Sequence, residues 1–176
     1  MIYLIRHGQT EWNIVGRYQG RKDIELNPKG IEQAKQIREK LKDIKFDVII
    51  SSPLKRAFQT ASIITNSKNI ITDDRIIERG NGDLEGRLKT EIIDTIDFNN
   101  INGSGHGIEN ITEFRKRIFD FLNEITNKYK GKNVLIVTHA GVGIYARCFF
   151  EGEPINNDYS IYKIKNCEVI EYNNDK

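Results

Sequence analysis

The sequence predicts an α/β fold, a three-layer α/β/α sandwich with a mainly parallel central sheet and helices on both faces. Two observations predict it. Short apolar runs alternate with longer amphipathic segments along the chain, which is the βαβ pattern of parallel sheets. The runs are also apolar at nearly every position, as expected of strands that helices cover on both sides. A length of 176 residues suits one unit, so residues 1–176 are interpreted as a single domain.

Six segments are expected to form strands because they are short and rich in apolar or β-branched residues. Three are strong candidates, one is weaker, and two lie late in the chain. In that order they are Tyr3–Ile5, Phe46–Ile50 and Val134–Val137, then Ile70–Thr72, then Tyr159–Ile164 and Glu168–Tyr172.

Two helices are predicted by a capping residue that is followed by proline. Asn27 precedes Pro28 and Ser52 precedes Pro53. Asparagine and serine cap helices through a side-chain oxygen, and proline suits the first helical position because no N–H is needed there. Apolar residues then recur at the spacing of one helical face. The inward positions are expected to be Ile31, Ala34, Ile37 and Leu41 in the first helix, and Leu54, Ala57, Phe58, Ala61 and Ile64 in the second.

Two further helices are expected in the second half of the chain. The longer one runs from about Glu109 to Tyr129, where apolar residues form a continuous stripe, and the last one follows His139. In parallel α/β sheets, ligands bind at the carboxyl ends of the strands. The residues that directly follow the predicted strands are therefore the candidates for a functional site.

Composition excludes several classes of protein. The 27 Lys and Arg residues nearly balance the 25 Asp and Glu residues and are scattered, whereas nucleic-acid binding favours a clustered basic face. No run approaches the ~18 apolar residues of a membrane span, and the apolar start before Arg6 is too short for a signal peptide. Cys148 and Cys167 stand alone, so a cytoplasmic location without disulfides is expected. The sequence does not decide between a monomer and a homodimer.

Basic residues follow three of the predicted strands. Arg6 and His7 end the first, His139 ends the strand at 134–137, and Arg56 lies just beyond the strand at 46–50. The chain has only three histidines, and for one alone a role in a core or loop would be the better interpretation. Here two histidines, His7 and His139, each follow a predicted strand and precede small residues. Because arginines are expected at the same edge of the sheet, a shared site is favoured.

These residue types suit a phosphoryl group. Arginine binds phosphate through two parallel hydrogen bonds and keeps its charge at every working pH. The N–H groups at the helix start after Ser52 and in the turn at Ala140 would add further anion contacts. A neutral imidazole in such a pocket is a nucleophile that needs no base. The arginines would also stabilise the charge that spreads over the equatorial oxygens during transfer.

A leaving alkoxide needs a proton, and one loop offers three carboxylates for that task. Glu78, Asp83 and Glu85 lie in the stretch that follows the weak strand at 70–72. General acid catalysis contributes about 10²–10⁴-fold to such reactions. Spacing alone does not choose among the three, and a solvated acidic loop is the simpler interpretation for any one of them.

The order of motifs resembles the histidine phosphatase superfamily, also called the phosphoglycerate mutase-like family. The stretch from Leu4 to Asn13, which reads LIRHGQTEWN, is similar to the signature of that family. The resemblance spans nearly the whole chain in the correct order. Its other blocks are Gly16–Gly20, Leu26–Gly30, Ser51–Ala57, Gln59–Ala61, Glu78 with Gly82 and Gly86, and Thr138–Val142.

The resemblance implies a role for each matched residue. It implies that His7 is the nucleophile that becomes phosphohistidine and that Glu78 is the proton donor. It implies neither a metal nor an organic cofactor, and the substrate would be a small phosphorylated molecule. The residues that would bind the phosphoryl group are Arg6, His7, Asn13, Gln19, Arg56, His139 and Ala140, with Arg6, Arg56 and His139 also counted as catalytic.

The acid loop separates phosphatases from mutases within this resemblance. Mutases resemble Glu-Arg-His-Tyr-Gly where this chain has Glu78-Arg79-Gly80-Asn81-Gly82. A mutase must hold a bisphosphate, yet residues 87–106 contain only the cations Arg87 and Lys89, of which Lys89 matches a mutase lysine. A phosphomonoester hydrolase is therefore expected. A mutase-type phosphotransferase using the same pocket and a non-catalytic phosphate-binding module are the alternatives.

Substrate choice is expected to lie in residues 87–108, which are interpreted as a variable specificity segment. The end of that segment, Gly107-Ile108-Glu109-Asn110 with Arg117 beyond it, partly matches a Gly-Glu-Ser block of small phosphatases. Small members of the family act on α-ribazole phosphate, sugar phosphates or a broad range of esters. The sequence does not choose among these substrates.

Overall fold

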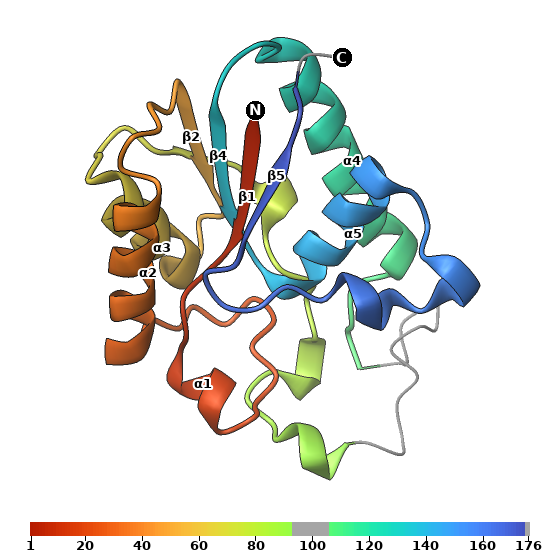
Figure 1. Ribbon diagram of the computed structural model, residues 1–176. Helices are drawn as coiled ribbons and strands as arrows, with labels where there is room; N and C mark the ends of the chain where they lie inside the picture. Colours follow the sequence, from red (N-terminus) through yellow and green to blue (C-terminus); the bar gives the residue numbers. More distant parts are fainter. Residues whose placement is uncertain (93–105, 175–176) are drawn as a thin grey trace.

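A computed structural model describes residues 1–92 and 106–174. It confirms the three-layer architecture (Figure 1). The sheet has the strand order β3-β2-β4-β1-β5. Four strands run parallel, and the edge strand β5 is antiparallel to β1. The strands are β1 (Ile2–Arg6), β2 (Val48–Ser51), β3 (Ile71–Thr72), β4 (Val134–Thr138) and β5 (Val169–Tyr172).

Helices cover both faces of this sheet. The pair α2 (Pro28–Lys40) and α3 (Lys55–Thr65) packs on one side, and the pair α4 (Ile111–Lys128) and α5 (Ala140–Glu151) packs on the other (Figure 1). A short helix, α1 (Glu11–Ile14), follows β1. None of the described helices is both long and apolar enough to cross a membrane.

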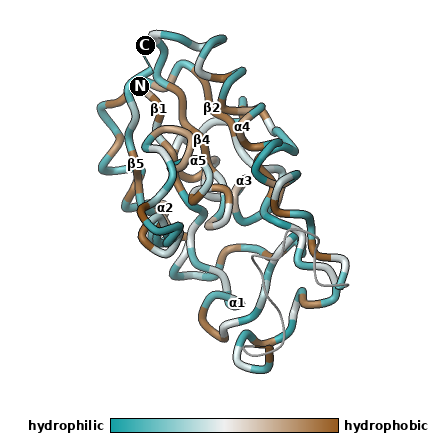
Figure 2. Tube along the Cα trace, turned by 90° about the vertical axis from the view of Figure 1, so that its right-hand side faces the viewer, coloured by the Kyte–Doolittle hydropathy of each residue, from teal (hydrophilic) through white to brown (hydrophobic). Residues whose placement is uncertain are grey.

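Alternate residues of the central strands divide between two cores. Tyr3 and Ile5 of β1 pack with α2 and α3, whereas Ile2 and Leu4 pack with α4 and α5. Successive strand side chains point to opposite faces, so a strand between two helical layers must be apolar at every position. In Figure 2 hydrophobic colour predominates along the central strands β1 and β4. The core therefore explains why the strands read as unbroken apolar runs.

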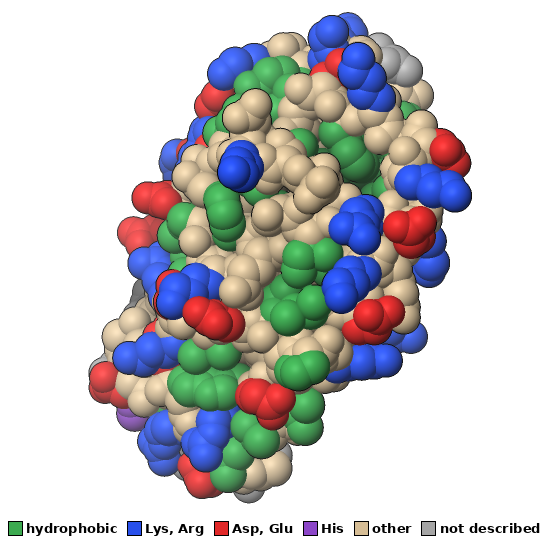
Figure 3. All heavy atoms as spheres, turned by 90° about the vertical axis from the view of Figure 1, so that its left-hand side faces the viewer, with side chains coloured by type: hydrophobic (Ala, Val, Ile, Leu, Met, Phe, Trp, Pro, Cys, Tyr) green, Lys and Arg blue, Asp and Glu red, His purple; other side chains and the backbone are tan. Residues whose placement is uncertain are grey.

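The outer surface of the α2 and α3 layer carries charges of both signs. Lys and Arg side chains are interspersed with Asp and Glu across this face (Figure 3). A surface of this kind lacks the clustered basic stripe that nucleic-acid binding requires. The scattered charges of the sequence thus remain scattered on this face of the molecule.

Two predictions about the elements were wrong. The segment Tyr159–Ile164 forms a 3₁₀ turn over Tyr159–Tyr162 rather than a strand. Asn156 has a positive φ, and the Asp158 side chain caps the turn by accepting a hydrogen bond from the Ser160 N–H. Local side-chain hydrogen bonds of this type compete with strand pairing.

The start of α3 also differs from the prediction. Leu54, with an extended backbone, is its N-cap rather than Ser52. Ser52 continues the strand geometry instead, because its N–H donates to the Val137 carbonyl. Two positions expected to face inward, Ile31 and Phe58, are each 38% exposed.

The loop after β1 is fixed against the first turn of α2. Asn27 caps that helix by accepting from the Gly30 N–H at 2.8 Å, as predicted, and its Nδ2 donates to Gln9 Oε1. A Cβ on Gly30 would lie 2.1 Å from the Gln9 carbonyl oxygen, and one on Gly8 would lie 2.6 Å from the Gly30 oxygen. These backbones approach so closely that only glycine fits, which sets the path of the chain just beyond His7.

Replacing Gly30 by Ala tests this approach. In an open helical turn, Gly→Ala stabilises by up to about 1 kcal/mol. Here the methyl group meets backbone, so we expect a loss of at least about 2 kcal/mol in the free energy of unfolding. Urea denaturation measures it, with the exposed Lys29→Ala as the control. An unchanged or higher midpoint for Gly30→Ala would contradict the close approach.

Candidate active site

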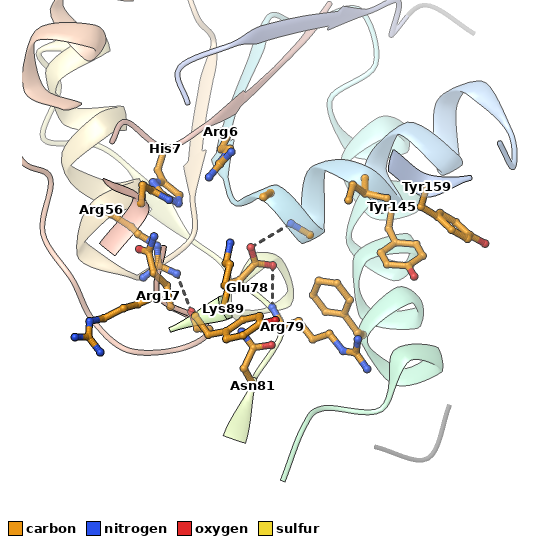
Figure 4. A pocket seen from close by; sticks show the side chains of 18 of the residues that line it. Arg6, His7, Arg17, Arg56, Glu78, Arg79, Asn81, Lys89, Tyr145 and Tyr159 are labelled. Carbon is orange, nitrogen blue, oxygen red and sulfur yellow. Dashed lines mark hydrogen bonds between the residues drawn. The ribbon is translucent and has the colours of Figure 1, made fainter. Parts of the chain in front are cut away.

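A cavity of about 300 Å³ opens at the carboxyl edge of the sheet. Its lining comes from both ends of the chain, because parallel pairing places the end of β1 beside the end of β4, with Arg6 opposite Thr138. Figure 4 shows Arg6, His7 and Arg56 gathered on one side of the cavity and Glu78 facing them. The predicted site residues His7, Arg6, Arg56, Glu78, Asn13, Gln19 and Ala140 all line it.

His7 is buried, with 3% of its surface exposed. Its Nδ1 lies 2.7 Å from the carbonyl oxygen of Gly8. A carbonyl oxygen only accepts hydrogen bonds, so Nδ1 carries the proton and Nε2 keeps its lone pair. Burial and the nearby charges of Arg56 and Arg6 hold the pKa of His7 well below its ordinary value. The ring is therefore neutral at neutral pH.

His139 lies beside His7 at the start of α5, with 5.2 Å between the ring centroids. It is fully buried, and its Nε2 lies 2.7 Å from Ser52 Oγ. This contact explains why Ser52 is not the cap of α3. Burial, together with the charges of Arg56 and Arg6, holds the pKa of His139 well below its ordinary value.

Arg56 and Arg6 supply the fixed charge of the site. Arg56 is 1% exposed, and its two terminal nitrogens each donate at 2.7 Å, to the carbonyl oxygens of Lys22 and Gly20. Arg6 donates to the Ile164 carbonyl at 2.9 Å. Burial lowers the pKa of Arg56 to about 10, which still leaves it cationic at neutral pH.

Three buried nitrogen atoms of this cluster have no hydrogen-bond partner in the described part of the chain. They are Nε of Arg6, Nε of Arg56 and Nδ1 of His139. Buried polar groups are nearly always hydrogen-bonded. Two of these nitrogens belong to the guanidinium groups themselves, so an anion bound here would meet both their charge and their unused N–H groups.

Asn13 and Gln19 reach the same cavity from the loop around α1. Asn13 and Thr10 form a capping box at the start of α1, in which Asn13 Oδ1 accepts from the Thr10 N–H at 3.0 Å. Its amide nitrogen is thus the group that remains to meet a ligand. Gln19 directly precedes Gly20, whose carbonyl oxygen accepts a hydrogen bond from Arg56. Ala140 is the first residue of α5.

Glu78 is the only one of the three candidate carboxylates that lines the cavity. Its Oε1 accepts from the Arg79 N–H at 3.0 Å, and its Oε2 accepts from the Gly141 N–H at 3.1 Å. Glu85 instead holds loops together, accepting from the N–H groups of Arg21 and Asn81, and Asp83 is exposed on the outside. The geometry thus distinguishes carboxylates that their spacing left equivalent.

The outer part of the cavity includes residues that sequence reasoning did not assign to it. Lys89 points inward beneath Glu78, and Tyr145 and Tyr159 form the opposite wall (Figure 4). Their rings lie 5.8 Å apart. Tyr145 comes from α5 and Tyr159 from the segment mistaken for a strand, so only tertiary packing brings them together. Of the expected specificity segment, residues 93–105 lie outside the described part.

No group of three or more His, Cys, Asp or Glu side chains that could hold a metal ion occurs within residues 1–92 and 106–174. The arrangement is instead a neutral imidazole between two guanidinium groups, opposite a carboxyl group. Such a set can bind a phosphoryl group, attack it and protonate what leaves.

Comparison with known proteins shows the family to which the chain belongs. The sequence profile of the histidine phosphatase superfamily (branch 1) matches residues 2–176. Phosphoserine phosphatase 1 of Hydrogenobacter thermophilus is 37% identical over 147 residues, covering 78% of this chain and 70% of that protein. The 2,3-bisphosphoglycerate-dependent phosphoglycerate mutase of Cytophaga hutchinsonii is 33% identical over 155 residues, covering 79% and 71%.

A solved structure is similar over nearly the whole chain. The phosphoserine phosphatase of Entamoeba histolytica, in complex with 3-phosphoglyceric acid, superposes with a TM-score of 0.80 at 30% identity, covering 96% of this chain and 87% of that one. The resemblance found in the sequence motifs is confirmed. The chain belongs to the histidine phosphatase superfamily.

Proposed function

We propose that this chain hydrolyses phosphomonoesters of small metabolites through a phosphohistidine intermediate on His7, with Glu78 as the proton donor. The observation that carries the proposal is the state of His7. Its proton is fixed on Nδ1 by the Gly8 carbonyl, and its pKa is held low by burial and by Arg56 and Arg6. A neutral ring with a free lone pair beside two guanidinium groups is poised to attack phosphorus.

In the first half-reaction, a bond forms between Nε2 of His7 and phosphorus while the ester P–O bond breaks. Arg6, Arg56 and the N–H group of Ala140 at the start of α5 meet the charge on the non-bridging oxygens. The phosphate dianion favours protonation of His139, which then donates a hydrogen bond to it. Asn13 and Gln19 add amide contacts at the same wall. In the second half-reaction, water attacks the phosphohistidine and releases inorganic phosphate.

Glu78 protonates the leaving oxygen in the first step. Each carboxyl oxygen offers two lone-pair positions, so the carboxyl group keeps its two backbone contacts and still directs an O–H at the ester oxygen. After proton transfer the ionised Glu78 is placed to take a proton from the attacking water. The same residue therefore serves both half-reactions.

The leaving-group side of the cavity, which Arg17, Arg79 and Lys89 line, favours an anionic substrate. Arg17 donates to the Gly86 carbonyl and Arg79 donates to the Glu109 carbonyl. Lys89, whose ammonium lies 5.7 Å from the Tyr18 ring centroid, remains to meet a substrate charge. An ammonium group with three donors is suited to a substrate carboxylate. Phosphoserine and phosphoglycerate, named in the relatives, are thus the first substrates to try.

We also propose a cytoplasmic location. Both cysteines, Cys148 and Cys167, are buried and unpaired with each other, as is usual in a reducing compartment. Burial raises the pKa of Cys148 to about 11 and that of Cys167 to about 12. Neither thiol is therefore activated for chemistry.

Product analysis tests the proposed reaction. The protein should release inorganic phosphate from phosphoserine and from p-nitrophenyl phosphate. His7→Ala should lower kcat by at least about a thousand-fold, because no other group supplies the nucleophile. His106→Ala, which changes a histidine that does not line the cavity and does not lie beside His7, is the control. With 3-phosphoglycerate and a bisphosphate primer, isomerisation without phosphate release would contradict a hydrolase and support a mutase.

The leaving group tests the role of Glu78. Nitrophenolate departs without a proton, whereas an alkoxide needs one. We therefore expect Glu78→Gln to lower kcat for phosphoserine by about 10²–10⁴-fold and to affect p-nitrophenyl phosphate much less. Asp83→Asn, in the same loop but outside the cavity, should change neither rate. Equal slowing of both esters by Glu78→Gln would argue against proton donation.

A further inference from the structure

A partly buried ion pair lies beneath the loop that carries Glu78. Arg117 of α4 donates to Glu109 through two nitrogens, from Nε to Oε1 at 2.8 Å and from Nη2 to Oε2 at 3.0 Å. The side chains are only 17% and 13% exposed. Burial alone would raise the pKa of Glu109, but the hydrogen bonds and charge of Arg117 outweigh it and hold that pKa below its ordinary value. Glu109 is therefore an ionised partner.

Glu109 holds the main chain just after Glu78. Its Oε2 accepts from the Gly80 N–H at 3.1 Å, and its own N–H donates to the Gly80 carbonyl at 2.9 Å. Its carbonyl oxygen accepts from Arg79 Nε at 2.9 Å. The two residues that follow Glu78 are thus fixed by three hydrogen bonds to one residue.

Arg117 holds the main chain before and at Glu78. Its Nη1 donates to the Arg75 carbonyl at 2.6 Å, and its Nη2 lies 3.3 Å from the Glu78 carbonyl. The ion pair therefore forms hydrogen bonds with the loop on both sides of Glu78. The Glu78 carboxyl group then extends from this fixed backbone to the Gly141 N–H at the start of α5.

Attachment of α4 to the sheet does not account for this arrangement. An apolar stripe already performs that task, because Phe114, Ile118 and Phe121 are at most 1% exposed within the core. Apart from the half-exposed Arg21, whose Nη2 lies 3.1 Å from Glu109 Oε1, the polar partners of the Glu109–Arg117 pair lie within residues 75–80. Groups that hold a catalytic side chain from behind fix its geometry, and a misplacement of 1 Å can cost about 10²-fold in rate.

We propose that Glu109 and Arg117 are positioning residues for the proton donor, which set where the Glu78 carboxyl group meets the leaving oxygen without touching substrate themselves. This inference rests on the proposed function. It assigns a role to the partial Gly-Glu-Ser match at residues 107–110, in which Asn110 serves as the N-cap of α4.

The test compares two esters in four variants. Glu109→Gln keeps the size of the side chain but removes its charge, and Arg117→Lys keeps the charge but loses the two-pronged contact. We expect each to lower kcat for phosphoserine by about 10- to 100-fold and kcat for p-nitrophenyl phosphate by less than about threefold. Lys116→Gln, which breaks an exposed pair with Asp120 on the same helix, is the control and should match the wild type. Thermal unfolding establishes that every variant is folded at the assay temperature.

The fourth variant, Glu78→Gln combined with Glu109→Gln, separates positioning from a general structural effect. If Glu109 acts through Glu78, the double variant should hydrolyse phosphoserine within about twofold of Glu78→Gln alone. A further loss of tenfold or more, or equal slowing of both esters by Glu109→Gln and Arg117→Lys, would overturn the inference. Failure of the proposed function looks different, because Glu78→Gln itself would then show no preference between the esters.

Discussion

The whole arrangement depends on one constraint, the burial of an uncharged imidazole between two charges that cannot be removed. Placing a cationic His7 beside Arg6 and Arg56 in a buried site would cost both solvation and repulsion, so the ring stays neutral. The Gly8 carbonyl then decides which nitrogen holds the proton. In the proposed reaction this ring is a nucleophile that needs no base, and the same guanidinium groups meet the charge of the group it attacks.

The fold supports this constraint from several directions. Parallel pairing of β1 with β4 brings residues 6 and 7 beside residues 138 and 139. The close approach of Gly8 and Gly30 fixes the turn that follows His7. Arg56 also donates to two carbonyls of the 20–22 loop. It therefore fixes that part of the cavity wall as well as supplying charge. The loop that carries Glu78 is held separately, by Arg117 of α4 and by the Gly141 N–H at the start of α5.

Much of the fold and the site was predictable because the signals were local. Short stretches of sequence predict the continuous apolar strands and the Asn27 cap of α2. The topological rule for parallel sheets then places the site at the strand ends. The match of motifs chose Glu78, which spacing alone did not. The structure adds a reason, since Glu78 lines the cavity and neither Asp83 nor Glu85 does.

The predictions that were wrong depended on contacts between distant residues. Ser52 looked like a helix cap, but it lies against His139, 87 positions away. Tyr159–Ile164 has strand-like composition, yet Asn156 and Asp158 turn the chain before a strand can pair. The place of Tyr145 in the cavity likewise has no local signal, because it depends on how separate segments pack. Lys89 and Arg117 did fall in partial motif matches, but only the packing of the chain shows which groups they contact.

The protonation state of His7 is the most direct test of this account. Nitrogen-15 NMR of the imidazole groups, with His7→Asn used to assign the signals, reports which ring nitrogen carries a proton. At about pH 6, where an exposed histidine is largely cationic, the account predicts a neutral His7 with the proton on Nδ1 and a bare Nε2. A cationic ring at that pH, or a proton on Nε2 of the neutral ring, would contradict it.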